Sequence, residues 1–169
     1  MQLEHAQKIA NAIMGQLAPH CDRIEIAGSV RRKRPWVKDI EIVCIPKPYE
    51  TGLFESGIAS VVNQWKKKKG ELPCKNTQRY IPVRTQNGTT HIVLDLFLVK
   101  PENWGLQLAI RTGSAKYSHL VLATGWKKRG YTSVNGILTQ RGKQYPVYEE
   151  KDLFERIGLP YVLPENREV

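Results

Sequence analysis

The chain has few cysteines and no long apolar run. Three of its 169 residues are cysteine, and Cys21, Cys44 and Cys74 lack metal-ligand spacing, so we expect reduced thiols and neither disulfides nor a zinc site. No apolar run approaches the roughly 18 residues that a membrane helix needs. The N-terminus alternates polar and apolar residues, unlike a signal peptide. These features predict a soluble cytoplasmic protein with no membrane partner, and they are compatible with a bacterial or viral context.

Acidic residues are scarce relative to basic ones. The chain contains 26 Lys and Arg against 16 Asp and Glu, which gives a formal net charge of +10. The excess occurs in residues 1–110 and in residues 111–169, with runs at Arg31–Arg34, Lys66–Lys69 and Lys127–Arg129. Any single run is equally consistent with a solvated surface, but three runs favour a polyanion such as nucleic acid. The candidate DNA-binding residues in the last two runs are Lys66, Lys67, Lys68, Lys69, Lys127, Lys128 and Arg129.

Two acidic residues flank an isoleucine at the start of the apolar segment 39–45. In a strand, successive side chains alternate between the faces, so Asp39 and Glu41 share one face while Ile40 points the other way. Two neighbouring carboxylates repel each other unless a positive charge lies between them. A divalent cation is the simplest such charge, and the pair therefore predicts a metal site.

A Gly-Ser pair and two arginines precede these acids. Gly28 and Ser29 follow a short apolar run and supply a turn with exposed N–H groups and a hydroxyl. Arg31 and Arg32 supply guanidinium donors. Together these groups suit a polyphosphate, and phosphate carried by a metal ion is the implied substrate.

A third acid lies alone in a later apolar run. Asp95 is the single acid within residues 92–99, where the other side chains are apolar. An unpaired buried carboxylate is costly, so Asp95 needs a cation, a hydrogen-bond network or an open cleft. Taken alone, a structural salt bridge is at least as good an explanation as a metal. Beside Asp39 and Glu41, the metal interpretation is the stronger one.

The apolar spacing predicts an α+β protein, and 41% apolar residues are enough for a core. Helices are expected over residues 2–18, 52–68, 106–110, 116–129 and 149–156. Strands are expected over 23–27, 39–45, 79–84, 90–99, 131–134, 137–139 and 144–147. Asn87-Gly88 between two alternating segments indicates a hairpin. A composition change near residue 101 separates two domains, 1–100 and 101–169.

The spacing of Gly28-Ser29, Arg32, Asp39-x-Glu41 and Asp95 resembles the signature of the polymerase-beta-like nucleotidyltransferases. The C-terminal part is similar to the nucleotide-selecting subdomain of family X DNA polymerases in sequence order. That similarity includes Arg111-Thr112-Gly113-Ser114 and the segment Gly158-Leu159-Pro160-Tyr161. The resemblance covers about residues 24–169. It implies a palm domain with a mixed sheet flanked by helices, followed by a small C-terminal α+β subdomain.

The resemblance also implies residue roles. Asp39 and Glu41 would bridge two Mg²⁺ ions, with Mn²⁺ a possible substitute, and Asp95 would bind the catalytic ion and help to activate a primer 3′-hydroxyl. Gly28, Ser29 and Arg32 would hold the triphosphate, whereas Arg31 would face DNA or phosphate. The sugar and nucleotide contacts would be Ile110, Arg111, Thr112, Gly113, Ser114 and Tyr117. The partners would be a dNTP and primer-template or gapped DNA, bound by a monomer.

Three departures from the family pattern stand out. The second metal acid is Glu41 where these polymerases usually have Asp, and Lys38 precedes Asp39 where glycine is usual. Ile110-Arg111 replace an aromatic pair that lies against the incoming sugar, so we expect weak selection between deoxyribose and ribose. The chain also has no room for the N-terminal lyase and DNA-gripping domains of larger relatives, so no lyase activity is expected.

Three functions compete. The first is a DNA polymerase that fills short gaps in DNA repair. The second is a template-independent nucleotidyltransferase acting on RNA, protein or a small molecule with the same two-metal site. The third is a nucleic-acid-binding module without catalysis, against which the presence of all three acids argues. The sequence leaves templating, fidelity, pathway and partner proteins open.

Overall fold

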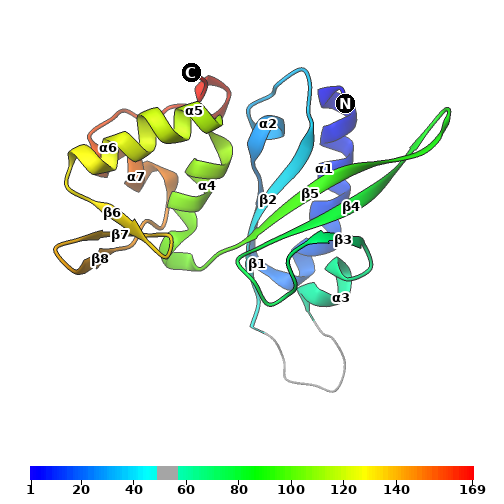
Figure 1. Ribbon diagram of the computed structural model, residues 1–169, viewed down its shortest axis with the longest axis horizontal. Helices are drawn as coiled ribbons and strands as arrows, with labels where there is room; N and C mark the ends of the chain where they lie inside the picture. The colour runs from blue at the N-terminus through cyan, green and yellow to red at the C-terminus, as the bar shows by residue number, and fades with distance from the viewer. Residues whose placement is uncertain (49–56) are drawn as a thin grey trace. The chain divides into compact units, whose positions relative to one another are not determined.

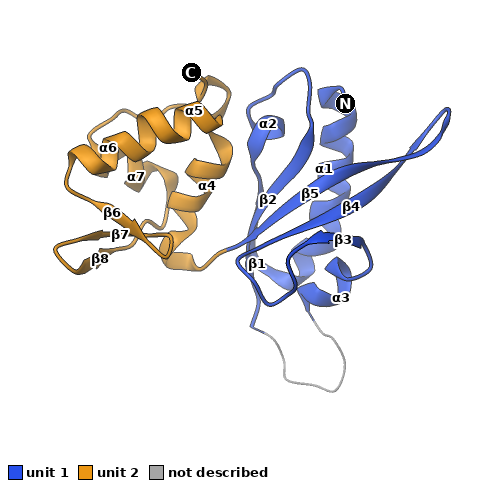
Figure 2. Cartoon of the chain, viewed as in Figure 1, with its two compact units in different colours: residues 1–98 blue, residues 99–169 orange. Residues whose placement is uncertain are grey.

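The computed structural model describes residues 1–48 and 57–169. The chain divides into two compact units, Met1–Leu98 and Val99–Val169 (Figures 1 and 2). Among the described residues, no helix combines the length and apolar character that crossing a membrane requires.

The first unit is built on a mixed sheet. In its described part, five strands lie in the order β1-β2-β5-β4-β3. Their bounds are Cys21–Ile26 (β1), Asp39–Pro46 (β2), Lys66–Lys69 (β3), Asn76–Thr85 (β4) and Gly88–Leu98 (β5). Strands β2 and β5 are parallel, whereas the other neighbours are antiparallel. This sheet confirms the predicted α+β class.

Helices cover one face of this sheet. Helix α1, Leu3–Leu17, buries Ala6, Ala10, Ile13 and Leu17, which recur at helical spacing. They pack with Ile40 and Ile42 of β2 and with α3, Ile58–Val62, in one core. Burying each such Ile or Leu side chain stabilises the fold by about 1.5–3 kcal/mol. Because strand side chains alternate, this core turns the acids of β2 toward the other face, which we call the open face.

A short helical turn joins β1 to β2. Helix α2, Gly28–Arg31, follows β1, and the 3-10 turn η1, Ala18–His20, precedes that strand. The backbone N–H of Ala27 donates to Glu41 O at 2.8 Å, which ties the end of β1 to β2 beside α2. The sequence pattern therefore places the Gly-Ser turn next to the Asp39-x-Glu41 segment.

The predicted helix over residues 52–68 is wrong at its C-terminal end. Residues 52–56 lie outside the described part of the chain, the helix itself is Ile58–Val62, and Lys66–Lys69 is a strand at the sheet edge. Arg79 is 1% exposed, and its guanidinium donates to backbone oxygens at the end of this helix and just after the strand. These bonds run to Val62 O at 3.2 Å and Gly70 O at 3.0 Å. Sequence periodicity cannot predict such hydrogen bonds, because Arg79 is distant in sequence from the segments it contacts.

The predicted hairpin is confirmed. Strands β4 and β5 pair antiparallel along their length, and Thr85 pairs with Gly88. The loop is therefore Gln86-Asn87, and Gly88 follows it with φ +118, a backbone conformation that favours glycine. This turn sets which residues of β4 lie opposite which residues of β5.

The second unit is a small α+β structure. Its three-stranded antiparallel sheet consists of Thr132–Val134 (β6), Ile137–Gln140 (β7) and Lys143–Tyr145 (β8). Its helices are Trp104–Thr112 (α4), Ala115–Tyr117 (α5), Thr124–Lys128 (α6) and Glu150–Ile157 (α7), with 3-10 turns at Pro101–Asn103 (η2) and Pro164–Asn166 (η4). Leu106, Leu122 and Phe154 are among the residues of its core.

The predicted apolar face of the helix over 116–129 is partly wrong. Residues Ser118–Ala123 form a π-helix (η3) between α5 and α6. A π turn inserts an extra residue and shifts the phase of everything after it. As a result Leu120, which was expected in the core, is 53% exposed, whereas Leu122 is fully buried.

Candidate active site

Three acidic residues lie on the open face of the five-stranded sheet. Asp39 and Glu41 come from β2, and Asp95 comes from the neighbouring parallel strand β5, directly opposite Glu41 in the register. All three are half-buried, whereas Ile40 and Leu94 between them are fully buried. The alternation predicted from sequence thus places the acids on one face, and the parallel pairing makes them neighbours.

The local field is unfavourable for a charged Asp39. Burial raises the pKa of the Asp39 carboxyl, and the negative charge of Asp95 raises it further. Lys38 and Lys68 oppose these effects through their positive charges. Carboxylates crowded in this way favour either a proton or a cation among them.

Glu41 lies against the glycine of the Gly-Ser turn. Gly28 has φ +59, and a Cβ built on it would be 1.9 Å from Glu41 Oε2. A side chain at this position would have to displace the end of the Glu41 side chain, and the positive φ also favours glycine. The two motifs that the sequence identified separately, Gly28-Ser29 and Asp39-x-Glu41, are therefore in direct contact.

Ser29 contributes a buried hydroxyl beside this contact. Its Oγ has no hydrogen-bond partner among the described residues. Buried hydroxyls are normally hydrogen-bonded, so an unsatisfied one in a turn beside an acidic cluster is a candidate ligand contact. Arg31 ends α2 and Arg32 is its C-cap, and both side chains are half-buried.

The donor set suits a hard divalent cation, since it consists of carboxylate oxygens. Within the part of the chain that the structure describes, no group of three or more His, Cys, Asp or Glu side chains lies close enough to hold a metal ion. We conclude that the chemistry of the three acids fits a cation, whereas this conformation does not gather them around one.

A glutamine that the sequence did not single out contacts the acids. Gln78 of β4 is the register partner of Asp95, and its Nε2 donates to Asp95 Oδ1 at 2.7 Å. Gln78 is half-buried. Its hydrogen bond connects β4 to the acid of the neighbouring strand β5.

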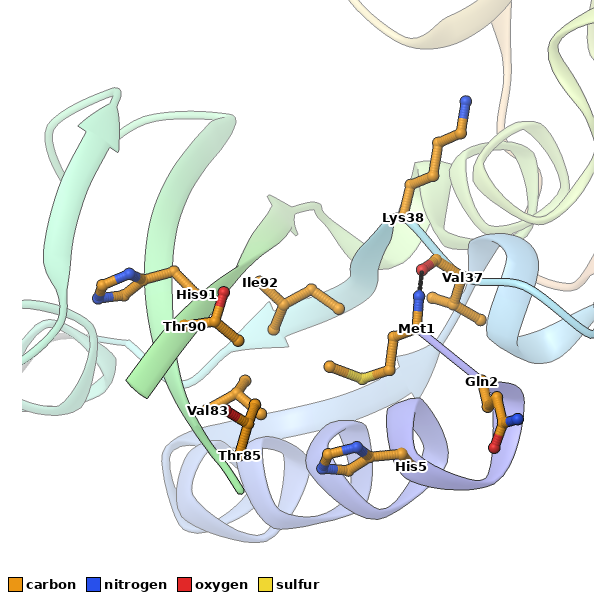
Figure 3. Close-up of a pocket in the computed structure, with 10 residues that line it drawn as sticks. All are labelled: Met1, Gln2, His5, Val37, Lys38, Val83, Thr85, Thr90, His91 and Ile92. Carbon is orange, nitrogen blue, oxygen red and sulfur yellow. Dashed lines mark hydrogen bonds between the residues drawn. The ribbon is translucent and has the colours of Figure 1, made fainter. Parts of the chain in front are cut away.

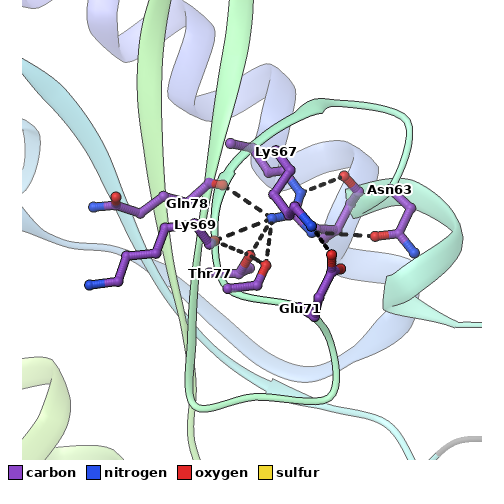
Figure 4. A network of polar contacts seen from close by, with 9 residues as sticks. Asn63, Lys67, Lys69, Glu71, Thr77 and Gln78 are labelled. Carbon is purple, nitrogen blue, oxygen red and sulfur yellow. Dashed lines mark hydrogen bonds and ion pairs between the residues drawn. The ribbon is translucent and has the colours of Figure 1, made fainter.

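The lysine strand contributes three of its four side chains to the same face. Lys66 pairs with Tyr80, and a register shift after Lys67 brings Lys69 opposite Gln78. Lys69 and Gln78 extend in the same direction in Figure 4. Lys68 Nζ lies 5.9 Å from the centroid of the Tyr80 ring. A regular strand would alternate, so the bulge explains why both Lys68 and Lys69 share this face.

Lys67 is the exception in that strand. It pairs with Arg79, whose side chain is on the core face, and its ammonium forms an ion pair with Glu71 (Figure 4). A pocket of about 520 Å³ lies there, lined in part by Asn63, Trp65 and Lys67. The four lysines therefore do not form one equivalent cluster.

A second pocket lies in the first unit. It has a volume of about 560 Å³ and is lined by the start of α1, by Val37 and Lys38, and by hairpin residues including Ile92 (Figure 3). The N–H of Met1 donates to Val37 O at 2.9 Å at its rim. Asp39, Glu41 and Asp95 are not among the residues that line it. Its lining includes Lys38, the neighbour of Asp39 in sequence, but none of the three acids themselves.

In the second unit, the predicted nucleotide contacts surround one turn. Thr112 is fully buried at the end of α4, and a Cβ on Gly113 would lie 2.9 Å from Tyr117 Cδ1. Ser114 Oγ accepts a hydrogen bond from the Tyr117 N–H at 3.1 Å and so caps α5. Tyr117 is almost fully buried, and its hydroxyl has no hydrogen-bond partner among the described residues.

The other predicted contacts of this unit lie in two places. Ile110 is partly buried and packs against the core of the unit, and its carbonyl accepts from Ser118 Oγ at 2.7 Å. Arg111 is half-buried in the last turn of α4. Lys127, Lys128 and Arg129 are exposed at the end of α6, as expected for a cationic last turn.

Comparison with known proteins addresses the fold. No protein-family model matches the sequence, and no curated protein matches it significantly. Solved structures with a similar fold include polymerase beta of Leishmania infantum in a ternary P/T complex. That similarity has a TM-score of 0.75 at 17% identity, over 100% of this chain and 77% of that chain. The fold is polymerase-beta-like. At this identity the likeness extends to the fold and not to a shared activity.

Proposed function

We propose that the chain is a nucleotidyltransferase that transfers a nucleotide from a dNTP to a primer 3′-hydroxyl. One observation carries the proposal. In a polymerase-beta-like fold, Asp39, Glu41 and Asp95 share the open face of two parallel strands, and Glu41 touches the Gly28-Ser29 turn. A set of acids next to a turn that suits phosphate fits phosphoryl transfer, in which positioning and charge neutralisation do most of the catalysis.

The three acids are proposed as ligands of divalent cations. Bound Mg²⁺ or Mn²⁺ would neutralise charge on the phosphates and lower the pKa of the attacking hydroxyl. The raised pKa of Asp39, caused first by burial and then by Asp95, supports this assignment, since a cation would relieve the same crowding. Asp95 lies opposite Glu41 in the register. We propose that its carboxylate orients the attacking 3′-hydroxyl.

The Gly-Ser turn is proposed to bind the triphosphate. Ser29 Oγ is buried without a partner among the described residues and is available to donate to a phosphate oxygen. Gly28, with φ +59, allows the turn to approach Glu41 closely. Arg32, at the end of α2, is proposed as the cationic contact to the same phosphates.

The second unit is proposed to select the nucleotide. The buried Tyr117 hydroxyl without a described partner and the compact Thr112-Gly113-Ser114 turn support a polar ligand there. The proposed nucleic-acid partner is a primer-template or short-gap DNA, in keeping with the net charge of +10. Gap filling in DNA repair is the corresponding biological role.

A primer-extension assay tests the proposal. We expect extension of a labelled primer with Mg²⁺ or Mn²⁺, and we expect Asp95→Ala to lower the rate by far more than tenfold while DNA affinity stays nearly unchanged. A tenfold loss corresponds to only about 1.4 kcal/mol of barrier, too little for a metal ligand. Single-stranded, templated and one-nucleotide-gapped substrates, with each nucleotide supplied separately, distinguish templated from untemplated transfer. No incorporation on any of them would refute the proposal.

A further inference from the structure

The amide of Gln78 is held against one oxygen of Asp95. Its Nε2 donates to Asp95 Oδ1 at 2.7 Å, a short and well-formed bond between half-buried side chains. The two residues are direct register partners on β4 and β5. The contact is therefore fixed by the pairing of two long strands and not by a flexible loop.

The chemistry of an amide suits a positioning role. A neutral N–H donor restricts rotation of the carboxylate that accepts its hydrogen bond. A lysine or arginine at the same place would do this as well, but its charge would repel a cation bound by Asp95. Gln78 orients the carboxylate without adding a charge of its own.

The surrounding contacts explain why Asp95 needs such a partner. Asp95 lies directly opposite Glu41 of β2, and neighbouring carboxylates repel each other. The hydrogen bond from Gln78, on the other neighbouring strand, restricts rotation of the Asp95 carboxylate. Asp95 thus has a carboxylate on the β2 side and a donor on the β4 side.

We propose that Gln78 is a positioning residue that holds Asp95 in the orientation needed to bind a divalent cation. This inference rests on the proposed function and goes beyond it, because it assigns a role to a residue outside the acidic signature. Partners that orient metal ligands typically change metal affinity by ten- to a hundredfold when they are removed. We expect a loss of that size for Gln78.

The test is a direct measurement of Mn²⁺ binding without any substrate, by electron paramagnetic resonance of the free ion. Gln78→Met removes the donor at nearly constant volume and charge, and Gln78→Asn keeps the amide but shortens its reach. The matched control is Asn76→Leu, two residues away on β4, which removes an amide that donates to Leu96 O at 3.3 Å. Thermal melting of each variant checks that it is folded.

We expect both Gln78 variants to bind Mn²⁺ at least tenfold more weakly than the wild type, while Asn76→Leu stays within about twofold. In primer extension, excess Mn²⁺ should recover most of the lost kcat, and the KM for dNTP should change little. Gln78→His, which retains an N–H donor, should recover part of the affinity. Wild-type affinity in a folded Gln78→Met protein would overturn the inference alone. A wild-type protein that binds no Mn²⁺ would overturn the metal site of the proposed function together with it.

Discussion

Gly28 and Glu41 are in contact, because a Cβ on Gly28 would lie 1.9 Å from Glu41 Oε2. The Gly-Ser turn and the start of β2 therefore touch through these two residues. A larger side chain at position 28 would move the Glu41 carboxylate. This relationship gives the first prediction.

Gly28→Ala should displace Glu41 and reduce nucleotide transfer by at least a hundredfold. The matched control is Gly57→Ala, because Gly57 has a similar φ of +69 and its Cβ would meet no described residue within 4 Å. Both variants incur left-handed backbone strain of about 1–2 kcal/mol, which thermal melting measures. Both variants should therefore melt at similarly lowered temperatures, but only Gly28→Ala should lose nucleotide-transfer activity. Equal activity in the two variants would show that the contact with Glu41 is unimportant.

Asp39→Asn should raise the melting temperature at pH 7 when divalent ions are absent. Burial and Asp95 raise the pKa of Asp39, so the folded protein binds this proton more tightly than the unfolded chain does. The contribution of Asp39 to the free energy of unfolding therefore falls as the pH rises from the pKa of Asp39 in the unfolded chain to its higher pKa in the folded protein. The gain from Asn should be largest above that window and should shrink in acid. It should not exceed about 1 kcal/mol, since the site is partly solvated. Added Mg²⁺ should stabilise the wild type only, and a lower melting temperature for Asp39→Asn at pH 7 would contradict this account.

Lys66, Lys68 and Lys69 should contribute more to DNA affinity than Lys67. The first three share the face of Gln78 and Tyr80, whereas Lys67 pairs with Glu71. Each phosphate contact that is lost should reduce the slope of log affinity against log salt by about 0.9 on duplex DNA. The measurement is a salt titration of DNA binding for single alanine variants, with Lys67→Ala as control. A flat plot for the wild type would argue against a nucleic-acid partner.

Selection between deoxyribose and ribose should be weak, with a kcat/KM ratio below about a hundredfold. The positions where family X polymerases have an aromatic pair hold Ile110 and Arg111, and Ile110 packs against the core of its own unit. In the family, the aromatic pair crowds a ribose 2′-hydroxyl, and losing that clash costs a few kcal/mol of discrimination. Each ~1.4 kcal/mol lost lowers the selectivity tenfold. Ile110→Tyr should raise the ratio, and steady-state kinetics with dNTP and NTP measures it. A preference of several thousandfold that neither Ile110→Tyr nor Arg111→Ala changes would place the selection elsewhere.

Much of the site follows from local sequence pattern. Strand alternation is enough to put Asp39 and Glu41 on one face, because the apolar residues between and after them must enter the core. The same reasoning places Asp95 opposite the core side of β5. These predictions depend only on period and polarity, which are properties of the chain itself.

The partners of those acids depend on register, which the pattern does not determine. A turn centred on Asn87-Gly88 would pair Gln86 with Thr89 and bring Tyr80 opposite Asp95. The turn that forms is Gln86-Asn87, so that Thr85 pairs with Gly88 and Gln78 lies opposite Asp95. Both registers leave every side chain on the same face, since they differ by two residues, and so alternation cannot distinguish them.

The sequence by itself determined the α+β class, the hairpin and the face on which the three acids lie, because burial enforces local periodicity. Tertiary structure alone decided that the lysine run is an edge strand held by Arg79, and that the π turn exposes Leu120 while burying Leu122. It also decided the contacts between Gly28 and Glu41 and between Gln78 and Asp95. Such contacts join residues far apart in the chain, where only the packing of whole strands against one another fixes which side chains meet.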